Sequence, residues 1–134
     1  MTNISKQQID PSDLQRLFKQ LSDVLGKLNT SKVDHVLGEL LGPEERIMLS
    51  KRFAVIVMLM EHNSIYKISD SLKVSTSTVA NILNNFERGK YKHITSFLQK
   101  NKDDYEKVWK TLEVILRGGL PPQGKDRWKS VFKT

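Results

Sequence analysis

The segment "ISDSLKVSTSTVANIL", Ile68–Leu83, holds two short helical patterns of apolar residues separated by a turn. Small Ser69 lies where two helices would approach closely, and Lys73 lies at the turn between them. The apolar positions are Ile68, Leu72, Val74, Val79, Ile82 and Leu83. This spacing predicts a helix-turn-helix, the motif whose second helix enters the major groove of DNA.

Four consecutive hydroxyl residues begin the second of these helices. Ser75 is suited to the N-cap, because its hydroxyl can accept a hydrogen bond from a backbone N–H of the first turn. Thr76, Ser77 and Thr78 then fall in that first turn, where short polar side chains can come close to base edges and phosphates. Ser and Thr begin helices in proteins of every kind, so the four hydroxyls indicate DNA binding only together with the helix-turn-helix spacing.

The residues around the turn include candidate phosphate contacts. Lys73 stands where glycine is common because φ is positive, and a lysine adopts that conformation at a cost of ~1 kcal/mol. Tyr66, Lys67 and Lys73 are the candidate phosphate contacts, with plain solvation as the alternative for each. Asn81 and Asn84 lie on the outer face of the second helix, where an amide can read adenine, contact a phosphate or be solvated.

Helical spacing of apolar residues continues through most of the chain, and no segment alternates with a period of two. Ala54–Met60 is apolar in every direction, so the helix that contains it must be enclosed on more than one side. Either the chain's own helices or interleaved helices of a second copy can enclose it. Outside the helix-turn-helix, we expect an all-α fold with helices at about 11–25, 33–41, 43–61, 91–98 and 105–116.

Composition and charge favour an anionic partner. The 134 residues carry a net charge of +7, and residues 86–134 hold twelve Lys and Arg against six Asp and Glu. A basic surface chosen for solubility is the alternative to a nucleic-acid footprint. The chain has no cysteine, no apolar run long enough to span a membrane and no secretory signal pattern at its start, so we expect a cytoplasmic protein without membrane partners.

The sequence contains no recognisable pattern of residues for catalysis or for binding a cofactor. "GLPPQGK", Gly119–Lys125, matches the outline of a phosphate-binding loop, but Asp126 replaces the Ser or Thr that holds Mg²⁺, and two prolines remove N–H donors. His35, His62 and His93 lack the spacing of metal ligands. We therefore expect no cofactor, no metal and no catalytic activity.

Residues 12–88 resemble the Trp repressor family. The resemblance is carried by "LLGPEERIMLSKRFAVIVML", Leu40–Leu59, by "SIYKISDSLKVSTSTVANI", Ser64–Ile82, and by the two helices before them. It implies an intertwined homodimer with the helix at 43–61 as shared core. It also implies a sequence-specific transcriptional regulator that binds double-stranded operator DNA, with half-sites ~34 Å apart.

The tryptophan pocket implied by this resemblance is altered. Arg52 matches the arginine that holds the indole, but Asn81 replaces the arginine that binds the ligand carboxylate. Ile82 replaces a glycine that leaves room for the indole, and Asn85 stands where a serine contacts the amino group. We expect no dependence on tryptophan, with any other effector unknown. Arg52 then has a structural alternative, an ion pair with a nearby acid such as Glu44.

We divide the single domain at residue 88. Residues 1–88 form the dimerisation and helix-turn-helix region, and residues 89–134 form a basic helical extension and tail outside the resemblance. The tail cations are candidate contacts to phosphates or a minor groove, whereas Trp128 and Phe132 are equally suited to anchor a short helix on the body. These cations are Lys125, Arg127, Lys129 and Lys133.

Three other functions compete with a specific regulator. A non-specific or architectural DNA binder would use the same basic surface without reading sequence. A protein-interaction module built on the same helices would be insensitive to salt and would leave the four hydroxyls unexplained. A DNA-binding part of a replication-initiation or transposition machine is the third, although no catalytic acids accompany the motif.

Overall fold

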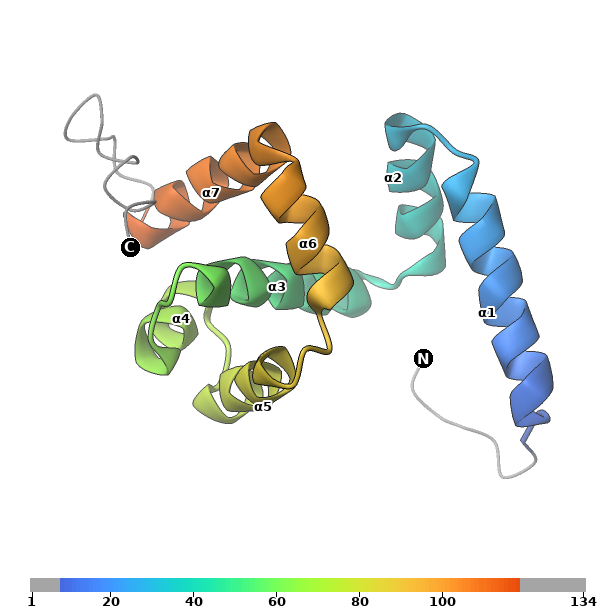
Figure 1. The fold of residues 1–134 in the computed structure, drawn as a ribbon, viewed down its shortest axis with the longest axis horizontal. Helices are drawn as coiled ribbons and strands as arrows, with labels where there is room; N and C mark the ends of the chain where they lie inside the picture. The colour runs from blue at the N-terminus through green and yellow to red at the C-terminus, as the bar shows by residue number, and fades with distance from the viewer. Residues whose placement is uncertain (1–7, 119–134) are drawn as a thin grey trace. The chain divides into compact units, whose positions relative to one another are not determined.

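The computed structural model describes residues 8–118, and within that range the chain forms helices and no strand (Figure 1). The predicted all-α class is confirmed. The chain divides after Ile47 into two compact units. The helices are α1 (Pro11–Gly26), α2 (Thr30–Leu40), α3 (Pro43–Met60), α4 (Ile65–Leu72), α5 (Thr76–Glu87), α6 (Lys92–Lys100) and α7 (Lys102–Leu116).

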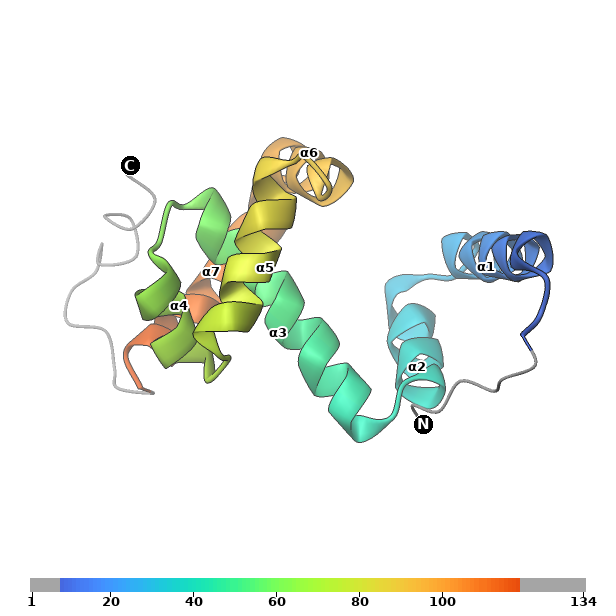
Figure 2. The same cartoon turned by 90° about the horizontal axis from the view of Figure 1, so that it is seen from below.

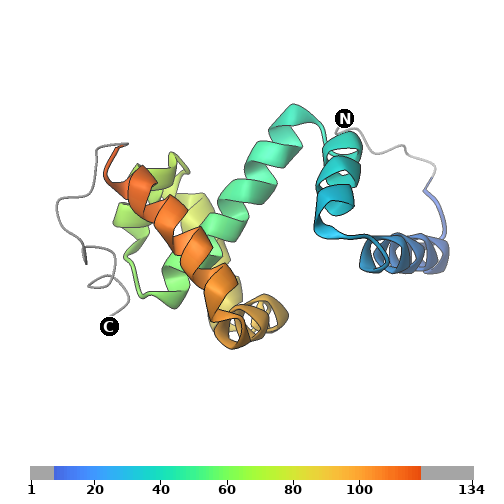
Figure 3. The same ribbon diagram turned by 90° about the horizontal axis from the view of Figure 1, so that it is seen from above.

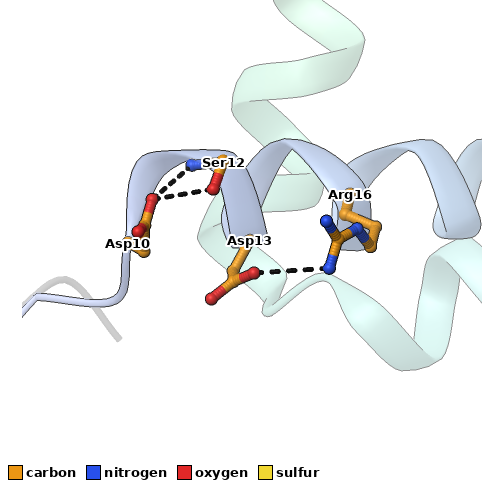
Figure 4. Close-up of polar contacts among 4 residues, drawn as sticks. All are labelled: Asp10, Ser12, Asp13 and Arg16. Carbon is orange, nitrogen blue, oxygen red and sulfur yellow. Dashed lines mark hydrogen bonds and ion pairs between the residues drawn. The ribbon is translucent and has the colours of Figure 1, made fainter.

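Helix α1 begins at a cap that the sequence specifies locally. Oδ1 of Asp10 accepts hydrogen bonds from the Ser12 backbone N–H at 2.9 Å and from the Ser12 hydroxyl at 2.8 Å (Figure 4). The backbone hydrogen bond and then the hydroxyl lower the pKa of Asp10 below its ordinary value. Pro11 occupies the first helical position, and Asp13 forms an exposed ion pair with Arg16 at 3.5 Å.

The next two helices also begin at local caps. The Asn29 side chain accepts a hydrogen bond from the Lys32 N–H at 3.0 Å at the start of α2. Before α3, Oε1 of Glu45 accepts the N–H of Gly42 at 2.7 Å, and Pro43 takes the first helical position. The helix boundary expected at Gly42-Pro43 is therefore confirmed.

The apolar residues of the first unit's helices are half-buried or exposed, and none is buried. Neither α1 nor α2 has a buried residue, although the apolar residues of α1 recur on one face. Phe18 is 70% exposed and Leu17 is 55% exposed. Since burial of such a face is what normally stabilises an amphipathic helix, these helices have an apolar surface that one copy of the chain does not use.

The second unit is built around the C-terminal half of α3. Val55–Leu59 are all buried, although they point in every direction around the helix. In all three views this half of α3 lies between the α4–α5 pair on one side and α7 on the other (Figures 1, 2 and 3). The enclosure that the sequence requires is thus supplied by the same chain. The other buried apolar residues are Ile68, Leu72, Val74, Val79, Ile82, Leu98, Trp109 and Leu112.

The last two described helices belong to this core. Trp109 is fully buried and is the largest such side chain, and Leu112 lies one turn further along α7. Helix α7 contacts both α6 and α4. The helices that follow residue 88 therefore pack on the helix-turn-helix and hold it in place.

Candidate nucleic-acid interface

Helices α4 and α5 and the turn between them form the predicted helix-turn-helix (Figure 2). The Ser64 hydroxyl caps α4 by accepting the Lys67 N–H at 3.1 Å. Lys73 ends α4 in the left-handed conformation, with φ 56° and ψ 50°. The positive φ predicted for this lysine is confirmed, and its side chain is exposed.

Hydrogen bonds across the turn fix its geometry. The N–H of Val74 donates to the carbonyl of Ser69 at 3.2 Å, and the Ser69 hydroxyl donates to the carbonyl of Val74 at 2.5 Å. Ser69 therefore does more than leave space between the helices. Its hydroxyl ties the end of α4 to the residue that leads into α5.

A lysine from α3 also holds the turn, and no pattern in the sequence predicts this contact. Nζ of Lys51 donates to the carbonyl of Lys73 at 3.0 Å. The ammonium group lies at the C-terminal end of α4, where the helix dipole favours a cation. These residues are 22 positions apart, so no local spacing pattern could reveal the contact.

Three of the four hydroxyls at the start of α5 bond to one another. The Ser75 hydroxyl accepts the Thr78 N–H at 3.1 Å, as predicted for an N-cap, and donates to the Thr78 hydroxyl at 2.8 Å. The Ser77 hydroxyl lies 3.2 Å from that of Ser75 and is the donor there, since Ser75 has only one hydroxyl proton. Thr78 is half-buried. The cap therefore accounts for much of the hydroxyl run.

Thr76 differs from its neighbours. Its side chain is exposed at the first position of α5, and it makes no hydrogen bond within residues 8–118. Ser77 is also exposed, with one contact in the cap. Thr76 and Ser77 are therefore exposed hydroxyl residues at the start of α5 that have fewer hydrogen bonds within the chain than Ser75.

The remaining predicted contacts lie where the sequence placed them. Asn81 and Asn84 are exposed on α5, whereas Val79 and Ile82 on the same helix are buried. In the first turn of α4, Tyr66 is 78% exposed and Lys67 is exposed. These positions are all open to solvent, and contact with DNA stays a prediction for each.

The positions that correspond to the tryptophan pocket do not form an open site around Ile82. Ile82 is only 5% exposed and belongs to the core of the second unit. Arg52 is exposed, and the two described ion pairs, both on α1, do not include it. Asn85 is half-buried on α5. The ion pair suggested for Arg52 is therefore not seen within residues 8–118.

The predicted tail contacts lie outside the described residues. This applies to Lys125, Arg127, Lys129 and Lys133, to Trp128 and Phe132, and to the whole of the segment 119–125. Among the described residues of the extension, several cations are exposed, namely Lys90, Lys92, Lys100, Lys102, Lys107 and Lys110.

Residues 8–118 contain no group of three or more His, Asp or Glu side chains that could hold a metal ion. No helix in that range is long and apolar enough to cross a membrane.

Comparison with known proteins identifies a family to which the chain is similar. The model of the family described as Trp repressor protein matches residues 12–110, which is most of the chain. Searches of curated proteins and of solved structures found no match. The matched region continues past residue 88, where the sequence analysis ended the resemblance. That limit was too short, since α6 and the first part of α7 fall inside the match and pack in the same core.

The family match and the geometry of the helix-turn-helix indicate the same class of protein. The family consists of DNA-binding regulators of transcription and is not a family of enzymes. The matched residues include the capped helix α5, the left-handed turn and the enclosed helix α3. The chain belongs to the Trp repressor family.

Proposed function

We propose that this protein is a homodimeric, sequence-specific regulator that reads operator DNA with the first turn of α5 and does not need tryptophan. The observation that carries the proposal is the exposed start of α5, where Thr76 and Ser77 follow a lysine held in the left-handed conformation. Its place of action would be the cytoplasm.

The start of α5 has the chemistry of a DNA-reading surface. The N-terminus of a helix favours the negative charge of phosphates, and short hydroxyl side chains allow it to approach base edges. Lys73 adds a cation directly before this helix, and Lys67 adds another on α4. In this assignment Thr76 and Ser77 contact bases, while Tyr66, Lys67 and Lys73 contact phosphates.

A second copy of the chain is the proposed cover for the open apolar surface. Helices α1 and α2 bury nothing in one copy, and the N-terminal half of α3 exposes Ile47, Met48, Leu49 and Phe53. Members of this family typically dimerise. A two-fold dimer would present two α5 helices to half-sites about 34 Å apart on one face of the duplex.

Independence from tryptophan is inferred from two side chains. Ile82 fills core space where an indole would need room, and Asn81 provides no positive charge for a ligand carboxylate. The start of α5 is instead held by contacts within the chain, from Lys51 and from the Ser75 cap. DNA binding would therefore need no ligand to orient this helix.

The test is a selection of random duplex DNA by the purified full-length protein, with and without L-tryptophan, at two salt concentrations. We expect a palindromic motif to be enriched without tryptophan and to be unchanged when it is added. Retention that depends on salt but yields no motif would indicate a non-specific or architectural DNA binder. An absence of retention would favour a protein-interaction module, and a motif seen only with tryptophan would contradict the inferred independence.

A further inference from the structure

The turn between α4 and α5 is held at both of its carbonyls by side chains of the second unit. The Lys73 carbonyl accepts a hydrogen bond from Nζ of Lys51 on α3 at 3.0 Å. The Val74 carbonyl accepts one from the Ser69 hydroxyl at 2.5 Å. Lys73 and Val74 are the whole link between the last residue of α4 and the Ser75 cap of α5. The direction in which α5 leaves the turn is therefore set by how these two residues are held.

Lys73 needs this support because its backbone conformation is unfavourable for a residue with a side chain. Its φ of 56° and ψ of 50° are left-handed, a region that residues other than glycine seldom occupy. A residue persists in such a conformation only where the surrounding structure holds it there. The Ser69 carbonyl accepts the N–H of Lys73 from within α4, whereas Lys51 holds the Lys73 carbonyl from a third helix.

Lys51 is itself placed by the rigid part of the second unit. It is half-buried on α3, and one turn further along this helix the fully buried Val55 begins the run of core residues. Within residues 8–118 the Lys73 carbonyl is the acceptor that Lys51 contacts, since the described ion pairs do not include this lysine. A hydrogen bond from an ammonium group is charge-assisted and about twice as strong as a neutral one. The turn is thus fastened to the core by a strong contact.

We propose that Lys51 is a positioning residue for DNA binding, which aims the start of α5 at the base edges without touching DNA. This inference rests on the proposed function, since it says how the reading helix is held. Base readout requires side chains to be placed within about 0.5 Å, whereas attraction to phosphates does not. Lys51 should therefore determine the affinity for operator DNA and not the affinity for unrelated sequences.

The two lysines that meet at the turn have different tasks in this proposal. The side chain of Lys73 is exposed and is the candidate phosphate contact, whereas Lys51 acts only through the Lys73 carbonyl. Salt dependence separates the tasks, because each phosphate that is neutralised adds about 0.9 to the slope of log affinity against log salt. Loss of Lys73 should lower that slope, and loss of Lys51 should not.

The first experiment measures the affinity of full-length wild type, Lys51→Met and Lys73→Met for two duplexes over a series of salt concentrations. One duplex carries the motif recovered in the selection of random DNA, and the other has the same length and a scrambled sequence. Lys51→Met should weaken binding of the selected duplex about tenfold, as when about one molecule in ten keeps the reading conformation. The scrambled duplex should be affected less than about twofold, with the salt slope unchanged on both.

Two control variants complete this experiment. Lys73→Met should weaken binding of both duplexes and lower the salt slope by about 0.9 for each protomer. Lys51→Arg keeps a charged donor at the same position and should retain binding of the selected duplex within about threefold of wild type. A loss in Lys51→Arg as large as that in Lys51→Met would contradict a role for the donor.

A second experiment needs no DNA and separates positioning from a general loss of stability. The N–H groups of Val74 and Thr78 donate within the turn and the cap, so their hydrogen exchange reports opening of this segment. Lys51→Met should speed exchange at both about tenfold, in line with its effect on affinity. Leu112, in the core on α7, should exchange at the wild-type rate. Equal acceleration at Leu112 would show that the whole unit is weakened and would overturn the positioning role.

The outcomes distinguish this inference from the proposed function. A wild-type protein that selects no motif would contradict the proposed function itself. Where the wild type does select a motif, equal affinity of Lys51→Met for it would contradict only the role of Lys51. An equal loss on both duplexes, or a salt slope lowered as in Lys73→Met, would show that Lys51 contacts phosphates and would likewise overturn the proposal.

Discussion

At the scale of single residues, the hydroxyl run at the start of α5 divides into a cap and a free group. Ser75 bonds to the Thr78 backbone and side chain, whereas Thr76 has no side-chain partner within residues 8–118. Two residues of similar chemistry therefore have different tasks. One stabilises the helix, and the other is available to a ligand.

This division predicts unequal effects of two alanine substitutions. Ser75→Ala should lower the free energy of unfolding by about 1 kcal/mol, because the first turn of α5 loses its cap. Thr76→Ala should change it by less than about 0.5 kcal/mol, since an exposed group without a partner is removed. Urea unfolding followed by circular dichroism measures both, and equal losses would show that the hydroxyls act as one cap.

The stability of the start of α1 should depend on pH through the carboxylate of Asp10. Its lowered pKa means that the ionised carboxylate stabilises the helix start. The contribution is complete above the ordinary carboxyl value of 3.8 and is lost as pH falls through the lowered value. The Ser12 amide resonance should follow this titration in an acid series. Asp10→Asn keeps the acceptor but has no charge to lose, so a titration that persists in this variant would assign the effect to another group.

Residue-level features were predictable where their causes are local. The positive φ of Lys73 and the cap at Ser75 were predictable, because the turn and the helix start depend on residues that are adjacent in the sequence. The Lys51 contact to the turn and the Glu61–Tyr105 hydrogen bond join residues 22 and 44 positions apart. Such contacts depend on how the helices pack, which the periodicity of one helix does not specify.

At the scale of secondary structure elements, α3 and α7 explain the stability of the second unit. The sequence predicted that Ala54–Met60 needs enclosure, because its apolar residues surround the helix. It could not tell the chain's own helices from those of a second copy, since periodicity shows which face is buried but not what buries it. The structure places α4, α5 and α7 of the same chain around this segment (Figures 2 and 3).

Trp109 should therefore be essential to the stability of the helix-turn-helix. Trp109→Ala should lower the free energy of unfolding by about 3–5 kcal/mol, because it removes the largest fully buried side chain. Val114→Ala on the same helix, at a position 45% exposed, should cost less than about 1 kcal/mol. Denaturant unfolding of the two variants compares them, and similar small losses would contradict a core shared by α7 and the recognition helix.

At the scale of the whole molecule, the exposed apolar residues of α1 and α2 are the reason for proposing a second copy as partner. These helices bury no residue in one copy, so their apolar faces should be stabilised only on association. The sequence indicated this through the resemblance to a dimeric family, and the exposure of Leu14, Leu17 and Phe18 supports it. The division of the chain after Ile47 could not be read from the sequence, because α3 continues through it.

We expect the protein to sediment as a dimer at micromolar concentration, with twice the 15.4 kDa mass of one chain. Phe18→Glu should weaken dimerisation by about a hundredfold, because it places a charge in the apolar face of α1. Gln20→Glu introduces the same charge outside that face and should leave the dimer intact. Analytical ultracentrifugation distinguishes the cases, and a wild-type monomer would remove the proposed two-fold arrangement.

The most direct test of the central claim is a repeat of the DNA selection with Thr76→Ala. The claim is that the first turn of α5 reads bases, so the variant should recover a motif with relaxed preference at one position in each half-site. A lost base contact of this kind is worth about 1–3 kcal/mol, whereas the dependence of affinity on salt should be unchanged. Recovery of the same motif with the same preference at every position would contradict the assignment of α5 as the reading helix.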